Sequence, residues 1–144
     1  MTSFFMEGDL MKQTDLDSLK QTDSMVNGLG IEYVETELER VVMTMPVDER
    51  HRQPLGFLHG GASVVLAETA ATTGAWLNCP DGKVAFGSEI NASHLRPKRE
   101  GTLTAVATPV QVGKTNQVWD ILISDEDEKT VCACRCRLAV VDAR

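Results

Sequence analysis

The sequence lacks any excess of positive charge. Its 144 residues carry a formal net charge of -7, and the isoelectric point is about 4.9. A nucleic-acid-binding domain usually has a basic stripe and a high isoelectric point, so the overall charge argues against a nucleic-acid partner. An acidic surface mainly favours solubility.

The four cysteines lack the spaced pairs of a disulfide-rich secreted domain. Cys132, Cys134 and Cys136 alternate along one predicted strand, so they share a face that we expect to be buried. Arg135 and Arg137 occupy the opposite face. Free thiols are typical of a reducing compartment, which predicts a cytoplasmic protein. Neither CxxC nor HExxH spacing is present, so we expect no metal.

A secretory leader and a membrane span are missing as well. The N-terminus has no positively charged region followed by a long apolar core. We expect residues 1–12 to be a disordered extension and residues 13–144 to form a single domain. The long, nearly uncharged run at 57–77 is rich in Gly, Ala and Thr and contains Glu68. A carboxylate at the centre of a membrane helix costs about 3 kcal/mol, which favours a helix buried in a protein core.

Hydrophobic periodicity predicts the element order α-β-β-α-β-β-β-β. Pro109 indicates a bulge or an edge position. An antiparallel sheet wrapped around one long central helix, an α+β fold, suits this order. The expected helices are 15–27 and 60–77, and the expected strands are 31–34, 39–45, 85–95, 101–113, 116–125 and 130–141, with the polar stretch ETELER joining the first two strands.

Two features of the 60–77 helix point to chemistry. Gly60 and Gly61 begin the helix, where unpaired N–H groups and the helix dipole stabilise an oxyanion; the alternative is a tight loop-to-helix junction. Glu68 and Thr72 lie four residues apart and share one face. A carboxylate among apolar groups is costly unless it is paired, and such carboxylates cluster at functional sites; the alternative is a hydrated helix face.

Other polar residues flank this helix. Gln53 and His59 precede it, and a lone histidine is more often a structural hydrogen-bonding group than a catalyst. A local basic cluster in an acidic protein indicates an anionic ligand such as phosphate groups; the alternative is a solvated strand end. The cluster comprises His94, Arg96, Lys98 and Arg99, with Lys114 in a later turn.

The stretches QPLGFLHGGASVVLAET and GSEINASHLRP, with NQVW further on, together resemble the hotdog-fold acyl-CoA thioesterases. The similarity covers residues 15–141 and is to the branch of phenylacetate-pathway, 4-hydroxybenzoyl-CoA and menaquinone-pathway 1,4-dihydroxy-2-naphthoyl-CoA enzymes. The run HGGASVVLAE is most similar to the menaquinone-pathway type. The resemblance implies a hotdog fold with a short N-terminal helix. It also implies hydrolysis of an acyl-CoA thioester, with an aryl-CoA such as 1,4-dihydroxy-2-naphthoyl-CoA favoured.

The resemblance further implies a role for each site residue. Glu68 would be the nucleophile or general base, and Thr72 would position the water. The Gly60 N–H would polarise the thioester carbonyl, while His59 and Gln53 would orient the acyl group. In the family these groups come from neighbouring subunits of a homotetramer, a dimer of dimers. The residues lining the CoA and acyl channel would be Gly61, Gly87, His94, Leu95, Arg96, Pro97, Gln111, Val112, Gly113, Lys114, Thr115 and Asn116.

Two other function classes compete with hydrolysis. A non-catalytic acyl-CoA-binding hotdog module would not need the set of Gln53, His59, Gly60 and Glu68 that is present here. A hotdog hydratase uses an Asp-His dyad with no evident counterpart. A thioester carbonyl needs only an oxyanion donor and a carboxylate, so no cofactor is expected, and CoA is part of the substrate.

Overall fold

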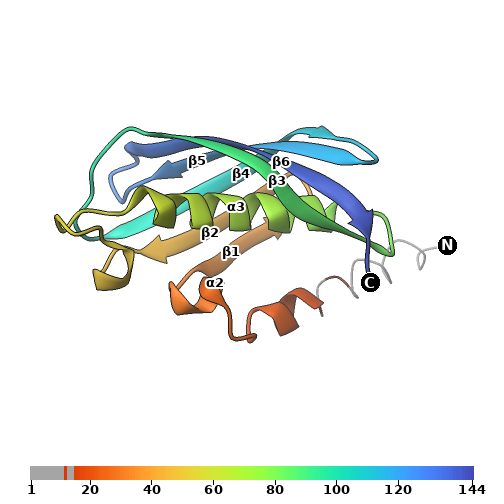
Figure 1. Ribbon diagram of the computed structural model, residues 1–144, viewed down its shortest axis with the longest axis horizontal. Helices are drawn as coiled ribbons and strands as arrows, with labels where there is room; N and C mark the ends of the chain where they lie inside the picture. Colours follow the sequence, from red (N-terminus) through yellow and green to blue (C-terminus); the bar gives the residue numbers. More distant parts are fainter. Residues whose placement is uncertain (1–11, 13–14) are drawn as a thin grey trace.

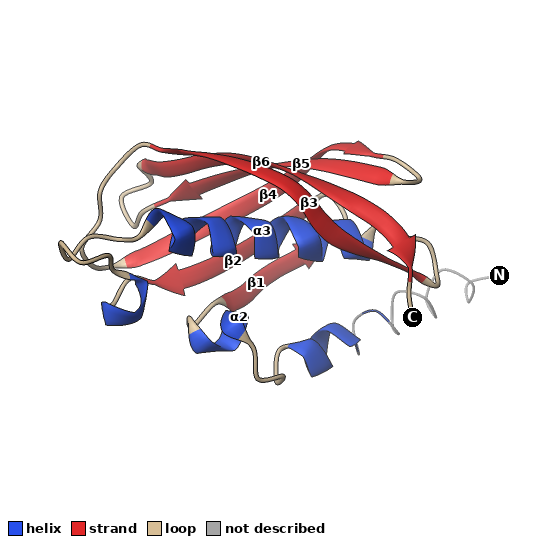
Figure 2. Cartoon of the chain, viewed as in Figure 1, coloured by secondary structure: helices blue, strands red, loops and turns tan. Residues whose placement is uncertain are grey.

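The computed structural model describes residue 12 and residues 15–144, and it shows an antiparallel sheet curved around one long helix (Figures 1 and 2). The extension expected at 1–12 therefore lies, apart from Lys12, outside the described residues. The helix is α3 (Gly60–Leu77). The six strands are β1 (Glu32–Glu37), β2 (Arg40–Pro46), β3 (Lys83–His94), β4 (Thr102–Val112), β5 (Asn116–Ser124) and β6 (Thr130–Asp142), in the sheet order β1-β2-β4-β5-β6-β3.

The core lies between α3 and the concave face of the sheet. On the helix side the buried residues are mostly alanines, such as Ala67, Ala70 and Ala71, and the sheet contributes larger side chains, such as Met43 and Leu138. Small residues on a helix let its backbone approach a neighbouring layer closely, because no long side chain stands between them. The long central helix predicted from the sequence is confirmed with the bounds expected for it. Within the part of the chain that the structure describes, no helix is long and apolar enough to cross a membrane.

Gly74 is the point of closest approach. A Cβ atom at this position would lie 2.5 Å from Cη2 of Trp119, whose side chain is fully buried on β5. Two hydrogen bonds extend this contact: Trp119 Nε1 donates to Gln117 Oε1 at 2.9 Å, and Gln117 Nε2 donates to the Ala75 carbonyl at 3.0 Å. Both side chains are buried, so the bonds satisfy polar groups that would otherwise be costly. The contact and the bonds fix α3 relative to β5.

The last strands of the sheet lie close to the residue ranges that the sequence periodicity predicts. The register between β4 and β5 shifts between Pro109 and Gln111, so the bulge indicated by Pro109 is confirmed. Cys132, Cys134 and Cys136 are buried free thiols, and the arginines between and after them are exposed. The alternation of β6 is thus the one that its sequence predicts.

The N-terminal helix is shorter than predicted. The expected helix at 15–27 divides into a helical segment at 15–19 and a separate α2 (Met25–Gly28). Ser24 begins α2 as its N-cap, its hydroxyl accepting from the Asn27 N–H at 3.5 Å, and the Asn27 side chain donates to the Thr22 carbonyl at 2.5 Å. Polar side chains that bond to nearby backbone compete with a continuous helix, and this competition breaks the predicted one.

The first hairpin is also tighter than predicted. Strand β1 continues through Glu37, which pairs with Arg40, so Leu38 and Glu39 alone form the connection and ETELER is not a loop. The glutamates fit within β1 because it is an edge strand with an exposed face, and charged residues are typical of sheet edges.

We predict that Gly74→Ala destabilises the protein by about 1–3 kcal/mol through overpacking against Trp119. Urea unfolding monitored by circular dichroism would measure the loss. Gly28→Ala is the matched control, because a Cβ there meets no atom within 4 Å, and its unfolding midpoint should stay within error of wild type or rise slightly. Equal midpoints for the two variants would contradict the close approach of α3.

Candidate active site

Glu68 projects from the middle of α3 toward the edge strand β3. A Cβ atom at Gly87 would lie 2.0 Å from Glu68 Oε1, so the glycine leaves room for the carboxylate above the β3 backbone. No described residue forms a hydrogen bond or ion pair with this carboxylate. The Cys136 thiol lies close to this carboxylate. Burial, and secondarily the charge of Glu68, raise the pKa of Cys136 to about 12. The Glu68 carboxylate therefore has a defined position over Gly87 but no hydrogen-bond or ion-pair partner among the described residues.

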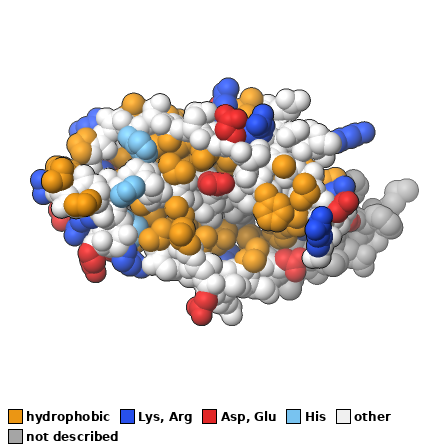
Figure 3. Space-filling model, in the orientation of Figure 1, with side chains coloured by type: hydrophobic (Ala, Val, Ile, Leu, Met, Phe, Trp, Pro, Cys, Tyr) orange, Lys and Arg blue, Asp and Glu red, His pale blue; other side chains and the backbone are white. Residues whose placement is uncertain are grey.

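A groove of about 950 Å³ extends from Glu68. It lies between the N-terminal helical segments, α3 and the start of β3, and it is mainly apolar. Hydrophobic side chains gather on this face of the molecule (Figure 3). The apolar lining residues are Leu16, Leu19, Met25, Val26, Val65, Trp76, Val84, Ala85 and Phe86, and the polar ones besides Glu68 are Asp15, Ser18, Tyr33, Thr69, Thr72 and Thr73. We call this cavity the Glu68 groove.

The hydroxyl groups of the Glu68 groove differ in their availability. Thr69 Oγ1 donates to the Val65 carbonyl at 2.6 Å, and Thr73 Oγ1 donates to the Thr69 carbonyl at 2.8 Å. Burial raises the pKa of Tyr33, and a hydrogen bond with Thr73 partly opposes the rise. The Thr72 hydroxyl has no protein partner among the described residues and lies one turn beyond Glu68, as the sequence predicted. It is thus available to a ligand or a water molecule.

The first turn of α3 forms a second polar site. His59 is the N-cap of the helix, and its Nδ1 accepts from the Gly61 N–H at 2.8 Å. The Gly60 N–H has no acceptor among the described residues. The Gly61 N–H is thus used in capping, and the Gly60 N–H lies without an acceptor at the positive end of the helix, where the sequence predicted a donor.

The His94 ring packs directly on Gly60. A Cβ atom at Gly60 would lie 2.7 Å from His94 Nε2, so only glycine permits this contact. Gln53 lies nearby in the loop before α3; its Oε1 accepts from the Leu55 N–H, and its side-chain amide nitrogen has no described partner. Three of the predicted residues, His59, Gly60 and His94, thus come together at this end of the helix.

One polar residue of this region was missed by the sequence reasoning. His51 is fully buried; its Nδ1 accepts from the Asp48 N–H at 3.1 Å, and its Nε2 lies 2.7 Å from the Leu29 carbonyl. Asp48 and His51 form the capping box of a short 3-10 helix at Glu49–His51. An Asp followed three residues later by a side-chain acceptor was the available signal. The role of His51 is to tie this loop to the segment after α2.

The predicted basic cluster does not assemble as one patch. Lys98 donates to Glu126 Oε1 at 3.0 Å, and the Arg99 guanidinium stacks on the Phe57 ring at 4.1 Å. Of the predicted cations, Arg96 and Lys114 remain exposed without such contacts. The two lie at opposite ends of the 11-residue β4, roughly 35 Å apart along the strand. Within a single chain the 94–99 segment and the 111–116 turn therefore lie apart.

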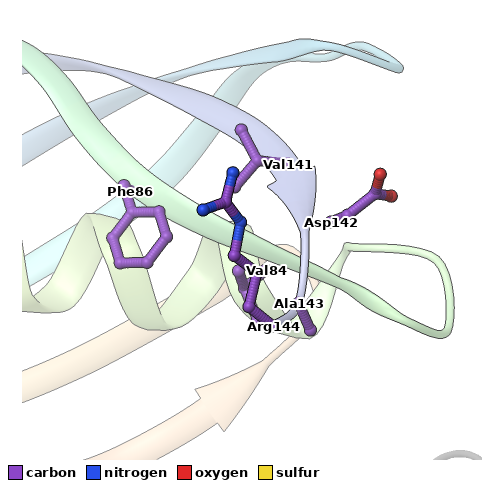
Figure 4. Close-up of a pocket in the computed structure, with 6 residues that line it drawn as sticks. All are labelled: Val84, Phe86, Val141, Asp142, Ala143 and Arg144. Carbon is purple, nitrogen blue, oxygen red and sulfur yellow. The ribbon is translucent and has the colours of Figure 1, made fainter.

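Another hollow, of about 730 Å³, lies beside the start of β3 and the end of β6 (Figure 4). It shares Val84 and Phe86 with the Glu68 groove. Its remaining lining residues are Val141, Asp142, Ala143 and Arg144. It holds none of the predicted site residues, so the Glu68 groove is the better candidate for substrate.

Gly60 and Glu68 are separated along one rigid helix. Eight residues of α3 correspond to roughly 12 Å along the helix axis. A reacting carbonyl must lie about 3 Å from both its oxyanion donor and its attacking group. The two groups of one chain are therefore too far apart to act on the same carbonyl.

An antiparallel sheet curved around one long helix is a hotdog fold, and the comparisons with known proteins place this fold among thioesterases. Residues 55–132 match the family model described as "Thioesterase superfamily", and the chain belongs to this family. It is 47% identical over 116 residues to a 1,4-dihydroxy-2-naphthoyl-CoA hydrolase of Listeria monocytogenes, covering 81% of this chain and 94% of the relative. It is 40% identical over 119 residues to the proofreading thioesterase EntH of Klebsiella pneumoniae, covering 83% and 87%.

A solved structure, that of thioesterase HI1161 from Haemophilus influenzae, has a TM-score of 0.83 at 45% identity, with 88% of each chain covered. The predicted hotdog fold is thus confirmed, and so is the enzyme class. The protein is a thioester hydrolase.

We predict that Gly87→Ala lowers kcat for acyl-CoA hydrolysis by about 100-fold, because the added Cβ displaces the Glu68 carboxylate and small misplacements of reacting groups cost this much. Free thiol release measured with a chromogenic thiol reagent would show the loss. Gly28→Ala makes the same chemical change in open space and should keep wild-type kcat. Full activity of Gly87→Ala would refute the functional importance of this contact.

Proposed function

We propose that the protein hydrolyses aryl-CoA thioesters, with 1,4-dihydroxy-2-naphthoyl-CoA as the favoured substrate. The main support is the Glu68 carboxylate, which lies unpaired over Gly87 at a large apolar groove. A flat aromatic acyl group suits a groove with apolar walls and a few hydroxyls. The Listeria relative, named for this substrate, supports the same choice.

In the proposed reaction Glu68 acts on the thioester carbonyl carbon in one of two ways. As a nucleophile it forms a carboxylic anhydride while the C–S bond breaks, and water then hydrolyses the anhydride. As a general base it accepts a proton from water as the water oxygen attacks the carbonyl carbon; the C–S bond then breaks, and Glu68 returns the proton to the CoA thiolate. Thr72 positions the water, and the Gly60 N–H stabilises the oxyanion. Either route consumes one water and yields the free acid and CoA, with no cofactor.

The proposed site is shared between two copies of the chain. Glu68 and Thr72 of one subunit would act with Gln53, His59 and Gly60 of a neighbour, because one helix separates these groups by roughly 12 Å. Strand β3 ends the sheet, so its outer edge is open to pairing, and Phe86 on it is 62% exposed. We propose a homotetramer built as a dimer of dimers, with the active sites at the dimer interface.

The same assembly would explain why the proposed CoA-binding residues lie far apart within one chain. In the proposed assembly the 94–97 segment of one chain would approach the 111–116 turn of its neighbour. In this proposal the exposed Arg96 and Lys114 bind CoA phosphates, while Lys98 and Arg99 hold the loop in place. The four buried free thiols support a reducing, cytoplasmic location.

We expect Glu68→Gln to lower kcat by about 10²–10⁴-fold, the usual effect of removing a positioned acid-base group. The neutral amide keeps the size of the side chain, so acyl-CoA binding should persist. Thiol release across naphthoyl, benzoyl and aliphatic CoA esters would measure both activity and preference. Binding without hydrolysis by the wild type would instead support the non-catalytic module, and a preference for aliphatic esters would exclude an aryl-CoA role.

Mixing two inactive variants tests the shared site. Coexpressed Glu68→Gln and Gln53→Ala chains form mixed dimers in which one site carries both changes and the other carries neither. With random pairing, about a quarter of all active sites contain only wild-type residues, so about a quarter of the wild-type activity should return. The controls are the two variants expressed separately. Activity no higher than that of the separate variants would show that both residues act within one chain.

A further inference from the structure

His94 lies between a buried thiol and the start of α3. It ends β3, where it is paired across the sheet with Cys132 of β6. Its Nδ1 lies 3.6 Å from Cys132 Sγ, and its Nε2 faces Gly60, 2.7 Å from where a Cβ would be. One nitrogen of the ring therefore contacts the core, and the other stands beside the free Gly60 N–H.

Two buried thiols lie beneath this ring. Cys134 Sγ lies 3.5 Å from Cys132 Sγ, and Cys132 Sγ lies 3.6 Å from His94 Nδ1. The three side chains can therefore form one chain of hydrogen bonds, which can run in either direction. When Cys134 donates to Cys132, the Cys132 S–H has the His94 Nδ1 as its acceptor.

A histidine whose Nδ1 accepts a hydrogen bond carries its proton on Nε2 when the ring is neutral. In this direction the chain of donors from Cys134 through Cys132 to His94 ends in an N–H that faces Gly60. The reverse arrangement, in which Nδ1–H donates to Cys132, would leave a lone pair beside Gly60. A lone pair there would repel a carbonyl oxygen held by the Gly60 N–H.

We propose that Cys132 holds neutral His94 in its Nε2–H form, so that His94 and the Gly60 N–H together bind the thioester carbonyl oxygen. This inference rests on the proposed function, in which Gly60 supplies the first donor. His94 is the second donor and stabilises the developing oxyanion without transferring a proton. Cys132 acts through His94 and is a positioning residue. The contact also explains why Gly60 must lack a side chain.

Nitrogen-15 NMR of the histidine rings tests the tautomer without any substrate. His59 and His51 are internal references, because each accepts a backbone N–H at Nδ1 and should carry its proton on Nε2. We expect the same two-nitrogen pattern for His94 in the wild type. Cys132→Ala should give a mixture of tautomers, and Cys132→Ser, whose hydroxyl still donates, should restore the Nε2–H form. A wild-type His94 protonated on Nδ1 would overturn the proposal.

Kinetics test the consequence for catalysis. We expect His94→Ala to lower kcat by about 100-fold, as loss of one oxyanion donor does, and Cys132→Ala by about tenfold, since part of the ring population keeps the correct tautomer. KM should change by less than about threefold, because the donors act mainly in the transition state. Cys79→Ala, which also truncates a buried cysteine, should retain wild-type kcat.

Two results separate this inference from the proposed function. If Glu68→Gln abolishes hydrolysis but Cys132→Ala behaves like Cys79→Ala, the reaction stands and the positioning role of Cys132 is wrong. If the wild type hydrolyses no CoA ester, the proposed function fails, and the role of His94 as an oxyanion donor fails with it. The NMR measurement would still decide whether Cys132 sets the tautomer.

Discussion

Helix α3 lies against the sheet at a point where no side chain separates its Gly74 backbone from the indole ring of Trp119. The hydrogen bond from Gln117 to the Ala75 carbonyl fixes the helix lengthwise at the same place. These contacts determine the position of every other residue on α3, because a helix is rigid and rises about 1.5 Å per residue. Glu68 is thereby brought over β3, and Gly60 is brought to the end of the sheet beside His94.

Glycine makes room for a particular side chain at three places on this interface. Gly74 admits the Trp119 ring, Gly87 admits the Glu68 carboxylate, and Gly60 admits the His94 ring. The first contact holds the fold together, whereas the other two position groups that the fold does not need. A carboxylate in a mainly apolar groove without a protein partner lowers stability, so its retention is better explained by chemistry than by packing.

The sequence was sufficient to predict α3, the order of the strands along the chain, the bulge at Pro109 and the buried cysteine face, because each depends on local periodicity or a single backbone constraint. It failed at 15–27, where Ser24 caps a new helix, and at the tight β1–β2 hairpin, where glutamates sit in an edge strand. The contact of Glu68 with Gly87 could not be predicted from spacing, because it depends on how far α3 stands above β3. The contacts of the basic residues could not be predicted from spacing either, because they depend on tertiary neighbours: Lys98 donates to Glu126, and Arg99 stacks on Phe57.

The length of α3 also constrains how the enzyme can work. A helix that places an oxyanion donor at its start and a carboxylate two turns later holds them roughly 12 Å apart, and no side-chain rotation brings a backbone N–H closer. If both groups act on one carbonyl, they must come from two copies of the chain. Catalysis then requires assembly, since in an isolated chain the oxyanion donor and the carboxylate are too far apart to act on one substrate. The open edge of β3, next to the Glu68 groove, is where a second copy would have to bind for the two halves to meet.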